Sequence, residues 1–131
     1  MAKVVYPVLF SPAQEGGYCV YVPDFDVNTQ GEDLAESLDM ARDVIGIMGI
    51  TWEDEQKQIP LPSSMENIKK EEQDILALVD IDFTEYRRKN DQRTERRNVT
   101  IPRWLNVLVK EHHINVSEVL TEALKDKLNV S

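Results

Sequence analysis

The first part of the chain contains two short apolar runs, separated by a polar segment, with the length and composition of β-strands. Val, Tyr and Phe are enriched over residues 3–10 and again over 17–22, and the polar segment 11–16 between them is typical of a hairpin turn. Pro23 ends the second run, and residues 27–30 have the length of a short third strand. The pattern therefore predicts a β-hairpin followed by one more strand.

A 3.6-residue period then predicts a helix. Asp33 can cap its start, and Glu36, three residues later, completes a capping box. The predicted apolar face consists of Leu34, Leu38, Ala41, Ile45 and Met48. Prolines make residues 59–64 an extended connection, and the apolar run 75–83 predicts a central strand that is buried on both sides over its first half.

The next segment, residues 84–95, is polar and strongly charged. Its cations are Arg87, Arg88, Lys89 and Arg93. We expect a short helix that fades into a flexible linker. This predicts a first domain over 1–86, a charged linker over 87–95 and a second domain over 96–131.

The second domain opens on a strand-like alternation. Val99 and Ile101 lie on one face, so Arg96, Asn98 and Thr100 lie on the other. Pro102 then ends the strand and suits the first turn of a helix. A lone strand leaves both edges unpaired, but two copies pairing antiparallel would form a ribbon that fits the DNA major groove.

Two short amphipathic patterns follow. The first repeats apolar positions at Leu105, Leu108, Val109 and His112. The second is capped by Asn115, with Glu118 at its third position. Its apolar stripe consists of Val119, Leu120, Ala123, Leu124 and Leu128. A plain helical hairpin with a basic lead-in would also fit these residues.

The order strand, proline, helix, capped helix resembles the ribbon-helix-helix family of dimeric DNA-binding proteins over residues 96–129. The resemblance implies that Arg96, Asn98 and Thr100 read base edges. It implies phosphate binding by Arg97 and Arg103 and by the start of the second helix, where backbone N–H groups and the macrodipole favour an anion. That start comprises Asn115, Val116 and Ser117.

The charge of the chain is −9 overall but unevenly distributed. Residues 1–86 hold 5 Lys+Arg and 18 Asp+Glu, a net charge of −13, whereas residues 87–131 hold 10 and 6, a net charge of +4. An acidic domain joined to a basic one indicates two partners of opposite charge.

The first half carries motifs that resemble the HicB antitoxin family over residues 4–83. They are Tyr-Pro near the start, then Gly-Tyr-Cys-Val-Tyr-Val-Pro-Asp, Thr-Gln-Gly, Leu-Ala-Glu-Ser and Ile-Pro-Leu-Pro-Ser. Two departures are Asp26-Val27-Asn28, where the family commonly shows Gly-Cys, and Asp33, where it usually shows Thr. The resemblance implies an α+β chain: a partial ribonuclease-H-like β-β-β-α-β domain, then a ribbon-helix-helix domain that dimerises and can form higher oligomers.

Members of that family neutralise HicA, a small basic toxin that cleaves RNA, and repress their own operon by binding operator DNA. The resemblance implies the same two partners here. For the toxin, the loop of Asp24, Phe25 and Asp26 is the local candidate, because it offers a ring between two carboxylates. The alternative is that Phe25 caps the sheet core.

No catalytic constellation is apparent, so we expect neither an enzyme nor a cofactor or metal site. Asp24, Asp80 and Asp82 are the carboxylates to consider for a ribonuclease-H-like hydrolase, one alternative; a ligand-sensing repressor is another. Cys19, the only cysteine, is expected to be a small core residue in a reducing compartment. Without a signal peptide or a run of ~20 apolar residues, the chain is expected to be cytoplasmic and to lack a membrane span.

Overall fold

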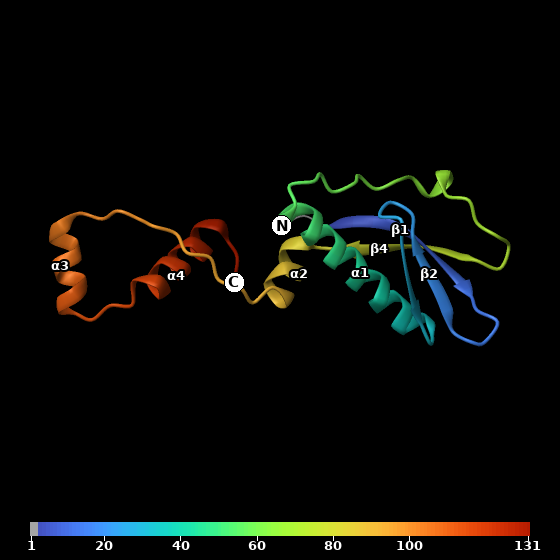
Figure 1. Cartoon of the computed structure of the whole chain (residues 1–131), viewed down its shortest axis with the longest axis horizontal. Coiled ribbons are helices and arrows are strands. Elements are labelled where there is room, and N and C mark those ends of the chain that lie inside the picture. Colours follow the sequence, from blue (N-terminus) through green and yellow to red (C-terminus); the bar gives the residue numbers. More distant parts are fainter. Residues whose placement is uncertain (1–2) are drawn as a thin grey trace. The chain divides into compact units, whose positions relative to one another are not determined.

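The computed structural model describes residues 3–131 and divides them into two compact units (Figure 1). The first unit ends at Arg93, and the second spans Thr94–Ser131. The first is an antiparallel sheet with helices, whereas the second contains helices and irregular chain.

The sheet of the first unit has four strands in the order β3-β2-β1-β4, all antiparallel. The strands are β1 (Val4–Pro12), β2 (Tyr18–Val22), β3 (Val27–Gly31) and β4 (Ile75–Ile81). The hairpin and third strand predicted from the sequence are confirmed. The prediction that 75–83 is a central strand is wrong, because β4 pairs only with β1 and lies at the edge, which leaves Leu78 54% exposed.

One glycine of the β1–β2 hairpin is required because the backbone of β3 lies close to it. Gly17 has a φ of +75°, and a Cβ added there would lie 2.6 Å from the carbonyl oxygen of Gly31 on β3. A side chain would therefore collide with backbone as well as strain the turn. Gly17 thus allows the hairpin to close against β3.

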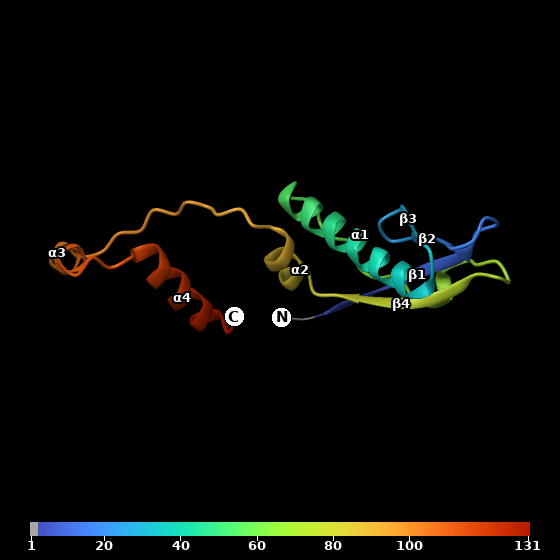
Figure 2. The same cartoon turned by 90° about the horizontal axis from the view of Figure 1, so that it is seen from below.

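Helix α1 (Leu34–Asp54) lies across one face of the sheet and contacts β2, β3 and β4 (Figure 2). Its predicted N-cap is confirmed, because the Asp33 side chain accepts from the Glu36 N–H (2.8 Å). The Glu36 carboxylate accepts from the N–H of Glu32, one residue before the cap (3.0 Å), and not from that of Asp33 as in a complete capping box. The N–H groups of the first turn lack partners within the helix, and the Asp33 carboxylate satisfies one of them.

The buried face of α1 differs from the predicted one. Leu34 and Leu38 are 40% and 36% exposed. The buried positions are Ser37, Ala41, Ile45, Gly46 and Gly49. Small residues are needed where the helix meets the sheet: Ser37 is completely buried against Gly31, and its hydroxyl donates to the Asp33 carbonyl (2.6 Å).

The core lies between α1 and the sheet. Its strand residues are Tyr6, Val8, Phe10, Val20, Val22, Val79 and Ile81. Cys19 alternates with Val20 and therefore lies on the opposite face of the sheet, where it is exposed. The prediction of a core cysteine is wrong, because β2 buries only its α1-facing side.

Helix α2 (Phe83–Asn90) completes the first unit. Asp82 caps it by accepting from the Glu85 N–H (3.1 Å). The sequence predicted a linker from residue 87, but Arg87 is paired with Glu53 and Asp54 of α1, so the folded chain continues to Arg93. With the boundary there, the first unit has 9 Lys+Arg and 19 Asp+Glu (net −10), and the second has 6 and 5 (net +1).

The second unit contains α3 (Arg103–Glu111) and α4 (Val116–Leu128). Of its residues 94–131, all of which the structure describes, none is buried. An apolar helical face left open to water lacks the burial that normally stabilises short helices. Along residues 3–131, no helix has both the length and the apolar character needed to cross a bilayer.

Candidate functional site

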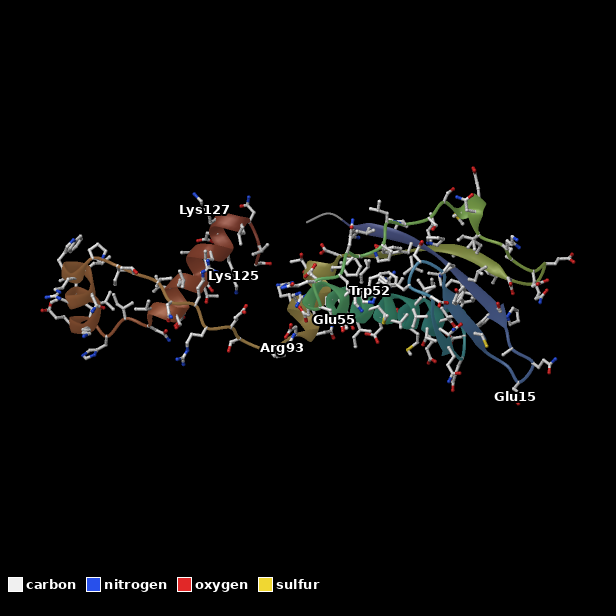
Figure 3. All side chains as sticks on the ribbon, turned by 45° about the horizontal axis from the view of Figure 1, so that its top comes forward. Glu15, Trp52, Glu55, Arg93, Lys125 and Lys127 are labelled. Carbon is white, nitrogen blue, oxygen red and sulfur yellow. The ribbon has the colours of Figure 1, made fainter. Side chains whose placement is uncertain are left out.

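The turn between β2 and β3 holds the residues predicted to face a partner. Phe25 is only 4% exposed, and its ring packs edge-on against Tyr6 (centroids 5.1 Å apart) and against Trp52 of α1 (5.4 Å; Trp52 is labelled in Figure 3). The turn thus folds its ring into the core. The structure contradicts the prediction of Phe25 as a surface anchor and supports the alternative that it caps the sheet core.

The two carboxylates of this turn have structural partners. Asp24 accepts from both the backbone N–H (3.0 Å) and the hydroxyl of Ser63. Asp26, which has a φ of +50°, accepts from the hydroxyl of Tyr21 (2.8 Å). Asp24 thereby fixes the extended connection after α1, and Asp26 fixes the turn itself.

Tyr6 binds the same extended connection after α1. Its hydroxyl donates to the Pro60 carbonyl (2.7 Å), and its ring is completely buried. Burial, with a smaller contribution from the negative charge of Asp24, raises the pKa of Tyr6 to about 12. Tyr6 thus joins the turn, through Phe25, to the connection, through Pro60.

Near α2 and β4, most acidic side chains already form ion pairs with Lys or Arg. Asp80 contacts Arg42 (3.0 Å) and Lys3 (3.2 Å), and these hydrogen bonds, first that of Arg42, lower its pKa.

By contrast, a polar hollow of about 890 Å³ at the far end of the unit is bordered by three carboxylates, Glu15, Glu32 and Glu36, and by no Lys or Arg. Glu15 projects from the hairpin tip (Figure 3). Sequence reasoning missed this hollow because its residues come from three separate segments.

The aspartates considered for hydrolysis have separate structural roles. Asp24 binds Ser63, Asp80 binds Arg42 and Lys3, and Asp82 caps α2. Within residues 3–131, no three His, Cys, Asp or Glu side chains lie close enough together to hold a metal ion. The geometry gives no support to two-metal chemistry, which needs converging carboxylates.

In the second unit, the predicted base-reading residues lie on irregular chain. Arg96, Asn98 and Thr100, with Arg97 between them, are all exposed, and residues 91–102 have no regular secondary structure. A strand is defined by its pairing, and a single chain offers this segment no partner. Its pairing with a second copy therefore stays a prediction.

The predicted phosphate-binding positions lie at the starts of the two helices. Arg103 is the first residue of α3. Asn115 caps α4 by accepting from the Glu118 N–H (3.1 Å). The N–H groups of Val116 and Ser117, the first two residues of the helix, have no carbonyl acceptor within it. The predicted cap is confirmed, and its geometry suits an anion.

Apolar side chains of the second unit are exposed on every segment. Val99 is 52% exposed, Leu124 48% and Leu128 68%. Others are Ile101, Trp104, Leu105, Val107, Leu108, Val116 and Val119. A group this large on so short a chain is typical of a surface that a partner covers.

Comparison with known proteins identifies a family and several relatives of this chain. The family described as "HicB_like antitoxin of bacterial toxin-antitoxin system" matches residues 6–123. Antitoxin HicB of Escherichia coli K12 is 39% identical over 61 residues, which are 46% of this chain and 44% of that protein. Antitoxin HicB 1 of Photorhabdus laumondii is 46% identical over 59 residues, 44% of this chain and 37% of that protein. The matches thus span less than half the length of these curated relatives.

Two solved structures share the fold. One, described as a toxin-antitoxin complex from Streptococcus pneumoniae, matches with a TM-score of 0.60 and 27% identity over 96% of this chain and 99% of that one. The other, the antitoxin HicB of Burkholderia pseudomallei, matches with a TM-score of 0.56 and 26% identity over 96% and 97%. Both matches cover the first and the second unit.

Proposed function

The chain belongs to the family of HicB-like antitoxins of bacterial toxin-antitoxin systems, and from this premise we propose that each unit binds a different partner. The first unit binds and neutralises a small basic HicA-like toxin. The second unit forms a homodimer that binds operator DNA and represses the operon. The observation that carries this division is that the first unit has its own core, whereas the second exposes its apolar faces.

The charge of the first unit supports a basic partner. A net charge of −10 on 93 residues attracts a cationic protein over long range and accelerates its association. The relatives are antitoxins, a role without catalysis, and the chain is not an enzyme. We place it in the cytoplasm, where both operator DNA and the toxin's RNA are found.

The exposed side chains of residues 96–101 in the second unit support a role in DNA binding. Two copies of residues 96–101 pairing antiparallel would cover Val99 and Ile101 with the helices and present Arg96, Asn98 and Thr100 to the major groove. The start of α4 would then contact the phosphate backbone, which positions the dimer without reading sequence.

A ligand-sensing repressor finds less support. A hollow of about 400 Å³ between α1, α2 and β4 is bordered by ion-paired groups such as Arg42 and Asp80. Small-molecule sites are mainly apolar with a few converging polar groups. No feature of this hollow favours a ligand over the ion pairs that it already contains.

The toxin-binding role predicts which fragment of the chain neutralises the toxin. In cells that express the basic product of the neighbouring gene, residues 1–93 should restore growth as the full chain does, whereas residues 94–131 should not. The boundary follows from the contacts of Arg87 and Arg93 with α1. Growth assays with matched expression levels would measure this. A folded 1–93 fragment that fails to bind a toxin bound by the full chain would contradict the division of roles.

The DNA-binding role predicts different effects for neighbouring arginines. Arg96→Ala or Asn98→Ala should cost about 1–3 kcal/mol on the operator and much less on random DNA, because base contacts specify sequence. Arg97→Ala serves as the matched control and should weaken both complexes alike, because it is proposed to contact phosphate. Equilibrium titration on the two DNAs measures these changes. Equal losses for Arg96→Ala on both DNAs would show that its side chain does not read a base.

A further inference from the structure

Helix α2 packs on a face of α1 that contains two glycines. Gly46 and Gly49 are both buried and lie one turn apart. A Cβ at Gly46 would collide with the ring of Tyr86, and one at Gly49 would collide with the ring of Phe83. The absence of two side chains on α1 therefore creates the space in which the two rings of α2 lie.

Polar contacts hold the end of α2 and the residues after it. The Tyr86 hydroxyl donates to Asp43 (2.9 Å). Arg87 pairs with Glu53 (2.8 Å) and Asp54 (3.1 Å), and Arg93, labelled in Figure 3, pairs with Asp54 (3.3 Å). The fixed part of the chain thus continues beyond the helix to Arg93.

This segment cannot remain folded without α1. It has eight helical residues, Phe83–Asn90, most of them polar, and isolated helices shorter than about 12 residues are marginal in water. If the rings of Phe83 and Tyr86 left α1, helix α2 would therefore also unfold. Docking of α2 and formation of its helix are thus one two-state process.

We propose that the segment Phe83–Arg93 is a latch that sets the length of the free connector between the two units. When it is docked, the connector before the proposed ribbon strand consists of Thr94 and Glu95, two residues that reach at most about 7 Å. When it is released, the connector runs from Phe83 to Glu95 and has 13 residues, with a reach of about 45 Å. For a flexible chain, that lengthening lowers the effective concentration of one unit near the other.

The docking contacts all lie within the first unit, whereas the link between two binding activities rests on the proposed function. A side chain at Gly46 or Gly49 that displaces α2 would lengthen the connector and so alter how far apart the two units can act. A longer connector would loosen complexes in which both units are engaged on one assembly.

Tryptic cleavage of the full chain tests the latch. In Gly46→Ala, cleavage after Arg87, Arg88 and Lys89 should be about tenfold faster relative to cleavage after Lys69 and Lys70, which are exposed on the irregular chain between α1 and β4. Tyr86→Ala, which leaves α1 unaltered, should have the same effect. Ile47→Ala, at a half-exposed neighbouring position of α1, is the control and should change nothing. Alanine favours a helix more than glycine does, so weakening of α1 itself is not expected.

Small-angle X-ray scattering of the same variants tests the change in connector length. Gly46→Ala and Tyr86→Ala should both increase the maximum dimension of the full chain, and Ile47→Ala should not. An unchanged cleavage ratio or an unchanged dimension in both variants would overturn the proposal. Equal acceleration after Arg42, within α1, would also overturn it, because α2 would then unfold only together with the whole unit.

Discussion

The full chain carrying Leu120→Asp is expected to lose its dimer and its operator binding together. Leu120 lies on the apolar stripe of α4, between Val119 and the exposed Leu124. In the proposed homodimer this stripe forms the shared core, and a buried unpaired carboxylate there costs several kcal/mol. A loss of about 4 kcal/mol corresponds to dimer dissociation about 1,000-fold weaker.

Sedimentation at micromolar concentration measures the loss. Thr121→Asp is the matched control, since the neighbouring side chain is exposed and points away from the centre of the stripe. It adds the same charge to the same helix and should leave the dimer intact. A natural chain that sediments as a monomer with a folded second unit would refute the ribbon altogether.

Phe25→Ala is expected to cost the first unit about 3–5 kcal/mol of unfolding free energy. The ring contacts both Tyr6 and Trp52, so its removal leaves a cavity where the sheet, the turn and the helix meet. The loss is a large part of the roughly 5–15 kcal/mol that stabilises a typical domain. Denaturant unfolding followed by circular dichroism measures it.

Leu61→Ala provides the comparison, because Leu61 is 81% exposed and should change stability by no more than about 0.5 kcal/mol. A toxin-binding defect in Phe25→Ala is then expected only in proportion to the unfolded fraction. If Phe25→Ala kept full stability and nevertheless abolished toxin binding, the ring would be a surface contact and its assigned place in the core would be wrong.

Local chemistry made several features of the fold predictable from the sequence. The N-caps at Asp33 and Asn115 depend on residues three positions apart, and both are confirmed. The hairpin before Pro23 depends on a turn between two β-rich runs, and its pairing is confirmed. These signals lie within a few residues of each other, so no knowledge of the tertiary structure is needed to interpret them.

Features that depend on distant segments were not predictable in this way. The apolar residues of β4 indicated a buried strand, but its place at the edge follows from the strand order. The buried stripe of α1 includes Ser37 rather than Leu34, because close contact with Gly31 requires a small side chain. Hydrophobicity alone does not indicate how near two backbones approach.

The predicted sites show the same contrast. Phe25 between two aspartates looks like an exposed contact in the sequence, and only Tyr6 and Trp52, far away in the chain, explain its burial. Likewise, Arg87 looks like part of a charged linker until α1 supplies Glu53 and Asp54. The predicted base-reading residues Arg96, Asn98 and Thr100 lie on one segment that has no strand partner within a single chain, so their arrangement depends on a second copy of the chain.

The exposed Cys19 gives the face of the sheet away from α1 a chemical reporter. It is the only thiol of the chain and lies on β2, on the face away from α1. Its rate of alkylation therefore measures access to one known place, with no engineered residue and no background from other cysteines. A protein that covers this face would slow the reaction, whereas one that binds elsewhere would leave it unchanged. The natural chain can thus reveal which side of its sheet a partner occupies.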